Sequence, residues 1–381
     1  MKKIGIVTLY YKNYNYGGLL QAYAMQKVTS DMGYNSKLIS YSKGKYLYFF
    51  KRLIKLNFFF TIKNVYNRIR YSLKMRDNSF KKNIDNRINK FEEFIDFIPH
   101  TQVYDEKTIG MCQEDFDCFI CGSDQIWNPG WWTSSYFLSF VDGNKKKKIA
   151  YAASIGRSSL SNSEKKYMRD NLKDFHMISV RESNAKPLLM SFINKDVEFV
   201  LDPTLLVERQ QWKSLAREVK ITEPYAFVYM VGNEKKYKKN ICEICKSLNV
   251  KMVTLPNTKF TYDESDEKYG DIKLYEVGPR EWLYLMENSK YVFTDSFHGM
   301  VFSTIFEKNF WGFEREKEGH DSTNSRIYSL LKLLGLQDRL INPEMFLSPE
   351  KFRNSIDFVI INDKVKHLKE ESIKIFANSL K

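Results

Sequence analysis

The sequence is poor in the residues that build disulfide frameworks and metal centres. Only five of its 381 residues are cysteines and five are histidines. An odd, small number of cysteines in so long a chain predicts reduced thiols in the cytoplasm. Two C-x-x-C pairs, Cys118/Cys121 and Cys242/Cys245, lie much farther apart than the pairs of a zinc ribbon. We interpret these cysteines as buried apolar residues and predict no metal site.

Long apolar runs are also missing. The apolar cluster at residues 56–62 lies between Lys55 and Lys63, and about 18 residues are needed to span a bilayer. The first residues enter a strand pattern without the apolar core and cleavage site of a signal peptide. We therefore expect a cytoplasmic protein without a spanning segment.

The composition excludes disordered and fibrous proteins, since 43% of the residues are hydrophobic and 15% aromatic. At about 100 to 200 residues per domain, the length predicts two domains. Short apolar runs alternate with helical patterns, which is typical of parallel sheets covered by helices. We predict strands at 4–10, 37–41, 116–121, 148–153, 177–180, 197–201, 225–231, 251–255, 272–275 and 291–294. We predict helices at 18–32, 161–173, 183–194, 234–248, 280–289, 298–307, 325–335 and 363–379.

This alternation favours an α/β protein with two Rossmann-like domains. The first domain is expected at 1–203 and the second at 204–345. A helical segment at 346–381 could pack across the boundary. The oligomeric state is left open.

A basic, aromatic-rich helical insertion interrupts the first domain at residues 43–98. Its part from 43 to 90 holds fourteen Lys or Arg against two acidic residues. Such a segment could lie on an anionic membrane surface, on the inner face of the membrane, or could cover its own domain as a helical pair. No nucleic-acid-binding fold accompanies the charge, so we expect no nucleic acid partner.

Two polar motifs follow strands in the first domain. Asn15-Tyr16-Gly17-Gly18 joins the first strand to the first helix, where glycines and free amides favour an anion, although a tight turn explains them equally well. In the segment 121–129, Asp124, Gln125 and Asn128 could hold sugar hydroxyls and Trp127 could stack on a sugar ring. Alternatively, the aspartate caps a helix and the tryptophan belongs to the core.

Two further motifs carry charge or a histidine. Arg181 ends a strand, where it could clamp a phosphate or carboxylate or pair with Glu182 or another neighbour. His298, in the segment Asp295-Ser296-Phe297-His298-Gly299, lies where a strand turns into a helix. A histidine there is a candidate acid/base, although it could also only cap the helix.

Together these segments resemble the polysaccharide pyruvyl transferase family. The resemblance rests on residues 15–18, 20–22, 122–128, 151–154, 180–182, 201–204, 295–299 and 324–326. It implies a fold like that of B-type glycosyltransferases, with the two domains facing a cleft, the first on the acceptor side and the second on the donor side. It also implies transfer of pyruvate from phosphoenolpyruvate, a cosubstrate, to two hydroxyls of a cell-surface saccharide, with phosphate released. The acceptor could still be attached to a lipid carrier.

The resemblance also implies roles for single residues. His298 is the expected acid/base, with Asp295 orienting it or Asp124 activating the acceptor. The donor is expected to contact Arg181, Arg326, Ser296, Asn15, Gly17 and Gly18, and the acceptor Gln125, Trp127 and Asn128. Many members of the family carry an arginine where this chain has Ser296, so Arg326 is expected to replace it. No cofactor is implied.

Two other functions remain open from the sequence. The same architecture would serve a glycosyltransferase that uses a nucleotide sugar. A noncatalytic binding module of a surface-polymer assembly complex is the other alternative, with the basic insertion as its docking face.

Overall fold

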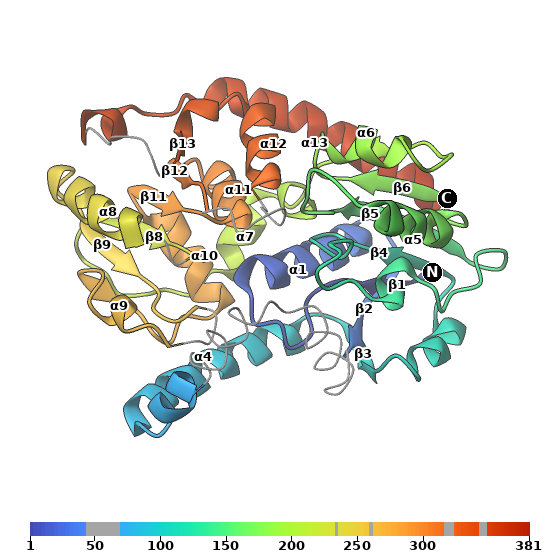
Figure 1. The fold of residues 1–381 in the computed structure, drawn as a ribbon, viewed down its shortest axis with the longest axis horizontal. Helices are drawn as coiled ribbons and strands as arrows, with labels where there is room; N and C mark the ends of the chain where they lie inside the picture. Colours follow the sequence, from blue (N-terminus) through green and yellow to red (C-terminus); the bar gives the residue numbers. More distant parts are fainter. Residues whose placement is uncertain (43–68, 233–234, 259–261, 316–323, 343–348) are drawn as a thin grey trace.

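The computed structural model describes residues 1–42, 69–232, 235–258, 262–315, 324–342 and 349–381. They form two α/β units, each built on an all-parallel sheet (Figure 1). The first sheet has the strand order β3-β2-β1-β4-β5-β6-β7 and the second β10-β9-β8-β11-β12-β13. The two sheets draw on residues 3–199 and 225–341, so the predicted boundary after residue 203 falls in the link between them.

The strands of the first sheet are β1 (Lys3–Val7), β2 (Asn35–Tyr41), β3 (His100–Tyr104), β4 (Cys118–Cys121), β5 (Lys147–Ala153), β6 (Met177–Val180) and β7 (Glu198–Phe199). Its helices are α1 (Tyr16–Asp31), α4 (Asn78–Phe97), α5 (Asn162–Leu172) and α6 (Ala185–Met190), with short 3-10 turns η1 (Ile109–Asp115) and η2 (Ser134–Phe137). The link to the second sheet holds η3 (Pro203–Leu205) and α7 (Arg209–Leu215). Several strands are buried along their whole length, as β4 shows, because helices cover both faces of a parallel sheet.

The second unit contains β8 (Tyr225–Tyr229), β9 (Lys251–Thr254), β10 (Ile272–Lys273), β11 (Tyr291–Thr294), β12 (Asn309–Phe313) and β13 (Leu340–Ile341). Its helices are α8 (Lys235–Ser247), α9 (Glu264–Glu267), α10 (Pro279–Asn288), α11 (Phe297–Ile305) and α12 (Ser325–Leu334), with η5 (Gln337–Arg339) and η6 (Pro349–Arg353). The sequence analysis missed β3, β12, β13, α7 and the short α9, whereas every strand that it predicted is present.

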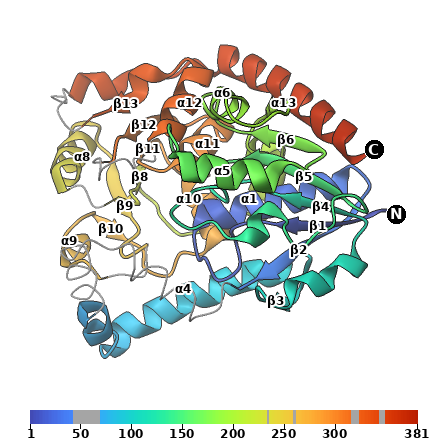
Figure 2. The same cartoon turned by 45° about the vertical axis from the view of Figure 1, so that its right-hand side comes forward.

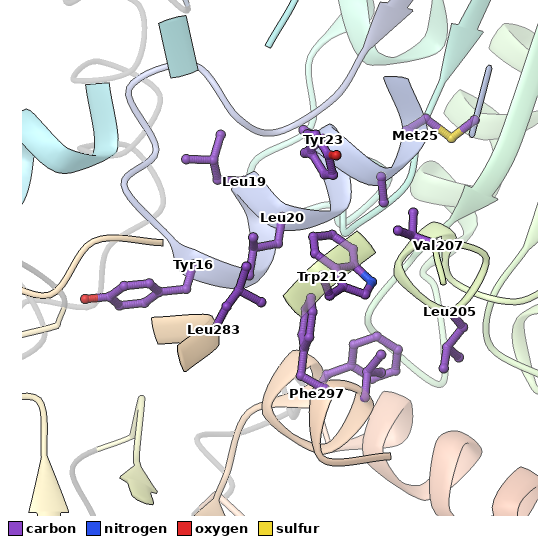
Figure 3. Close-up of a cluster of buried hydrophobic side chains, with 14 of the residues drawn as sticks. Tyr16, Leu19, Leu20, Tyr23, Met25, Leu205, Val207, Trp212, Leu283 and Phe297 are labelled. Atoms are coloured by element: carbon purple, nitrogen blue, oxygen red, sulfur yellow. The ribbon is translucent and has the colours of Figure 1, made fainter. Parts of the chain in front are cut away.

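Helix α1 forms the centre of the contact between the two units. Nearly all of its residues are buried, and one hydrophobic cluster contains residues of both sheets. Tyr16 stacks on Trp282 of α10 with ring centroids 5.9 Å apart, and Tyr23 meets Trp212 of α7 at 5.4 Å. Figure 3 shows α1 side chains, Leu20 among them, in one cluster with Trp212, Leu283 and Phe297. Such an apolar interface fixes the two sheets relative to each other.

The last helix, α13 (Phe358–Leu380), returns from the second unit to the first (Figure 2). Phe376 packs on Tyr151 of β5 with ring centroids 4.6 Å apart. Ser372 Oγ accepts a hydrogen bond from Leu201 N at 3.0 Å, and Lys2 Nζ donates to Leu380 O at 2.7 Å. The end of this helix therefore packs on the first unit.

The described half of the basic insertion binds the second unit. Arg87 of α4 is 1% exposed and donates to Pro256 O at 2.9 Å and to Asn257 O at 3.1 Å. Lys90 pairs with Glu281 at 3.1 Å. Lys74 lies 3.7 Å from Glu267. Several of the cations expected to meet a membrane therefore bridge the two units, while Arg76, Lys81 and Lys82 remain exposed. Residues 43–68 lie outside the described part of the chain.

Candidate functional site

The polar motifs gather where both sheets reverse their strand order. In the first sheet this point lies between β1 and β4, and in the second between β8 and β11. Segments after β4, β6, β7 and β11 carry Asp124, Arg181, Asp202 and His298. Carboxyl ends of strands at such switch points are the usual ligand sites of open parallel sheets. Because α1 joins the two units, both edges contribute to one site.

Arg181 is the centre of a buried ion network. Its side chain is fully buried. Nη1 donates to Asp202 Oδ2 at 2.5 Å, Nη2 donates to Asp124 Oδ1 at 2.9 Å, and Nε donates to Glu182 Oε1 at 3.2 Å. The ring of Phe297, from the second unit, lies 4.3 Å from the guanidinium carbon.

The network sets the charges of its members. Burial alone would lower the pKa of Arg181, but the surrounding carboxylates outweigh it and raise that pKa. Burial alone would raise the pKa of Asp124 and of Asp202, yet Arg181 holds both below their ordinary values. For Glu182 burial dominates over Arg181, and its pKa is raised. Arg181 is thus engaged by protein carboxylates, the alternative that the sequence left open.

Arg326 has a different environment. This residue of α12 is 5% exposed, and no carboxylate of the described residues lies within ion-pairing distance of it. The amide oxygen of Gln125, in the orientation that satisfies its neighbours, accepts from Nη1 at 3.2 Å and from Nη2 at 3.3 Å. Nε has no hydrogen-bond partner. Burial, reinforced by repulsion from Arg181, lowers the pKa of Arg326 to about 10. An anion bound here would compensate a buried positive charge.

His298 lies in the first turn of α11 and faces α1. A Cβ atom on Gly17 would lie 2.2 Å from His298 Nδ1, so a glycine is required at position 17 for the ring to approach α1. His298 is 5% exposed, and its Nε2 lies 3.7 Å from Asp202 Oδ2 without a hydrogen bond. The imidazole therefore keeps a buried nitrogen available for a proton transfer.

Asp295 does not orient this imidazole in the way we expected. Its Oδ1 accepts from Val231 N at 2.6 Å, and its Oδ2 accepts from Gly232 N at 2.5 Å and Arg315 Nε at 3.1 Å. These bonds tie the end of β11 to the loop after β8. The carboxylate beside His298 belongs to Asp202, because the segment after β7 reaches the interface between the units.

Two residues predicted to contact the donor cap helices. Asn15 is exposed, and its Oδ1 accepts from Gly18 N at 2.9 Å at the start of α1. Ser296 Oγ accepts from Gly299 N at 3.3 Å at the start of α11. These hydroxyl and amide groups satisfy backbone donors that the first turn of a helix leaves free. The structure thus explains both side chains by helix geometry.

The expected acceptor residues divide into two groups. Trp127 is fully buried, stacks on Phe137 at 5.8 Å and donates from Nε1 to Tyr136 O at 3.3 Å. Asn128 is 3% exposed, and its Oδ1 accepts from Gly130 N at 2.9 Å. Trp127 is thus a core residue, the alternative left open above, and Asn128 stabilises the turn. Gln125, in contrast, is half-buried and contacts Arg326.

The sequence analysis missed three residues of the site. Asp202 and Phe297 stood inside the quoted motifs, but neither was given a role. Arg315, two residues after the end of β12, was outside every motif. Its side chain is 26% exposed beside Asp295. The only signal for Arg315 in the sequence was its place two residues after β12, a strand that pairs with β11. Among the described residues no group of His, Cys, Asp and Glu is arranged to hold a metal ion.

Several solved structures share this fold. One is a putative UDP-N-acetylglucosamine 2-epimerase from Listeria monocytogenes, with 10% identity, a TM-score of 0.53, and coverage of 100% of this chain and 91% of that chain. Another is the UDP-GlcNAc 2-epimerase from Methanocaldococcus jannaschii, with 13% identity, a TM-score of 0.54, and coverage of 93% and 91%. AviGT4, a glycosyltransferase involved in avilamycin A biosynthesis, matches at 8% identity and a TM-score of 0.50, with coverage of 99% and 96%. The fold is therefore that of B-type glycosyltransferases.

A search of curated protein sequences gave no match. The family model for polysaccharide pyruvyl transferase matches residues 15–317, which is most of the chain and contains every part of the ion network and His298. On this match, the chain belongs to the polysaccharide pyruvyl transferase family, whose members are transferases.

Proposed function

We propose that this protein transfers the pyruvyl group of phosphoenolpyruvate to a saccharide and releases phosphate. The observation that carries the proposal is Arg326, a buried cation that no carboxylate of the described part of the chain pairs with, in the same cluster as His298. Phosphoenolpyruvate brings a phosphate and a carboxylate, and burying these without cations would be costly. Arg326 and the partly exposed Arg315 offer two guanidinium groups for them.

Ketal formation requires proton transfers that His298 can perform. A proton adds to C3 of the enol, and an acceptor hydroxyl adds to C2 and gives up its own proton. The C2–O bond to phosphate then breaks, and the second hydroxyl of the saccharide closes the ketal while its proton leaves. His298 is the general acid/base for these transfers, and Asp202 Oδ2 lies 3.7 Å from its Nε2.

The remaining polar groups fit positioning roles. Asp124 binds Arg181 through Oδ1, and its lowered pKa keeps it ionised but makes it a weak base. It is therefore suited to orient an acceptor hydroxyl through its other oxygen. The amides of Tyr16 and Gly17 open α1 beside His298, where the end of a helix favours an anion.

Replacing His298 with glutamine tests this assignment. Purified protein is incubated with phosphoenolpyruvate and candidate bacterial glycans, while released phosphate and the mass of the glycan are measured. We expect His298→Gln to lower the rate by about a hundredfold or more, since acid/base groups contribute that much, and to leave the melting temperature unchanged. His367→Gln, an exposed position on α13, is the matched control.

Full activity in His298→Gln would contradict the role of the imidazole. The same preparations also distinguish the glycosyltransferase alternative, which the fold permits. Thermal stabilisation by UDP-sugars together with none by phosphoenolpyruvate would reject the proposed donor.

An acceptor that is still attached to a lipid carrier would lie at the membrane. We therefore propose that the basic segment at residues 43–90 binds the inner membrane surface. Within the described residues no helix has the length and hydropathy to cross a bilayer. We expect the protein to sediment with phosphatidylglycerol vesicles at low salt and to be released at high salt. Glutamate at the exposed Lys81 and Lys82 should weaken this binding. Sedimentation that does not depend on salt, or no sedimentation, would reject the proposal.

A further inference from the structure

The side chain of Gln125 contacts the part of Arg326 that an anion would use. Its amide oxygen accepts hydrogen bonds from Arg326 Nη1 at 3.2 Å and from Nη2 at 3.3 Å. These are the two terminal nitrogens with which a guanidinium group grips a carboxylate or a phosphate. The amide of Gln125 and a substrate anion would therefore compete for the same N–H groups.

Arg326 has few other partners that could share its charge. The carboxylates of Asp124 and Glu182 accept hydrogen bonds from Arg181, and Arg181 itself repels Arg326. Within the part of the chain that the structure describes, Gln125 is the only residue that hydrogen-bonds to Arg326. The amide is thus what compensates this buried guanidinium.

An amide is a weaker partner for this guanidinium than an anion. Distances of 3.2 and 3.3 Å are longer than the roughly 2.7–2.9 Å that is usual between a cationic N–H group and an oxyanion. Glutamine also carries no net charge, so it compensates the buried cation only in part. An anion that reaches Arg326 would consequently displace the amide.

The contact can be broken without a change in the backbone. The carbonyl oxygen of Gln125 accepts hydrogen bonds from Trp131 Nε1 at 2.9 Å and from Asn128 N at 3.2 Å, which fix the main chain at this position. The side chain of Gln125 is only half-buried. Rotation about its own torsions is therefore enough to release Arg326.

We propose that Gln125 is an internal ligand of Arg326 that a substrate anion displaces. The inference rests on the proposed function for the identity of the anion, but the competition itself follows from the contact between the two side chains. The amide holds the guanidinium in position between turnovers, and its displacement lowers the affinity for the donor. Gln125 is thus a positioning residue of the donor site, whereas the sequence analysis expected it to contact only the acceptor.

The test measures anion binding without turnover. Gln125→Met removes the hydrogen-bonding oxygen, and Gln125→Glu replaces the amide with a carboxylate. Phosphoenolpyruvate and inorganic phosphate are each titrated into the full-length protein by isothermal titration calorimetry. We expect Gln125→Met to bind both anions about tenfold more tightly, because no hydrogen bond to Arg326 has to be broken.

Gln125→Glu should have the opposite effect on binding. Its carboxylate forms an ion pair with Arg326, so we expect both anions to bind at least about tenfold more weakly. The same ion pair compensates the buried guanidinium, so the variant should melt at a higher temperature than the wild-type protein when no anion is added. Gln113 of η1 provides the matched control. It is also half-buried, and it hydrogen-bonds to Gly110 and Asp142. Met and Glu at position 113 should leave the affinity for both anions unchanged.

Tighter binding in Gln125→Met together with weaker binding in Gln125→Glu supports the proposal. Weaker binding in Gln125→Met overturns it, since the amide would then help to hold the anion. Unchanged affinity in both variants, equal effects at position 113, or no binding of either anion to the wild-type protein also overturns it. If phosphate binding responds as expected but no pyruvyl transfer is ever found, the proposed function fails and the competition stands. Pyruvyl transfer with unchanged anion affinity in the variants means that the function stands and this inference fails.

Discussion

Replacing Arg181 with methionine will destabilise the protein strongly. The substitution leaves Asp124, Asp202 and Glu182 close together without the cation that now pairs with all three. Removing one partner from a buried ion pair costs about 3–5 kcal/mol, and three carboxylates share this one. The expected result is a shift of the urea midpoint to much lower denaturant in an equilibrium unfolding experiment.

Replacing Arg326 with methionine should preserve the stability of the protein but remove most of its activity. Arg326 is buried without a carboxylate within ion-pairing distance among the described residues. Methionine there removes a charge that burial disfavours, so stability should be unchanged or increased. Phosphate release from phosphoenolpyruvate should nevertheless fall by about a hundredfold or more, because the donor loses a preorganised cation.

The two methionine variants therefore separate a structural guanidinium from a substrate-binding one. Equal destabilisation by both would show that Arg326 has a protein counterion, and it would remove the main support for the donor site. Retained stability in Arg181→Met would show that the ion network contributes little to folding. Protection of Arg326→Met by phosphoenolpyruvate to the same extent as wild type would contradict the role of Arg326.

Much of the fold could be predicted because its signals are local. The buried strands β1, β4, β8 and β11 are short apolar runs, and β1, β4 and β11 are each followed by a polar motif at the site. Two of the missed strands lack such runs, and the third, β12, is apolar but contains a glycine. β13 has only two residues, β3 is an edge strand of mixed polarity, and β12 contains Gly312, which lies against Met300.

The partners within the site could not be predicted in the same way. Arg181 and Arg326 look alike in the sequence, since each stands near a helix and close to polar residues. Only the folded chain shows that the carboxylates of three separate strand ends surround one of them, while the other meets an amide. We expected Asp295 beside His298, but the structure has Asp202 there. This could not be predicted from the sequence either, because it depends on how the two units pack against each other.

Replacing Gly17 with alanine tests how closely α1 packs against His298. A Cβ atom at Gly17 would lie 2.2 Å from His298 Nδ1 and 2.6 Å from His298 Cβ. Contacts below 3.0 Å force a displacement, and the packed interface around α1 leaves little room for it. We expect Gly17→Ala to displace the imidazole from Asp202 and to lower pyruvyl transfer by about a hundredfold, as misplacement of a catalytic group by an ångström can do.

Gly18→Ala is the control, because it adds the same methyl group one residue further along α1. There the nearest atoms are Leu9 O at 3.2 Å, Asn13 Nδ2 at 3.4 Å and Asn15 Oδ1 at 3.5 Å, so only a small adjustment is needed. Alanine also favours the helix over glycine by about 1 kcal/mol, so this variant should keep its activity and melting temperature. Since both substitutions change helix propensity alike, any difference between them reports the contact with His298. Equal activity of the two variants would show that the imidazole does not need its present position against α1.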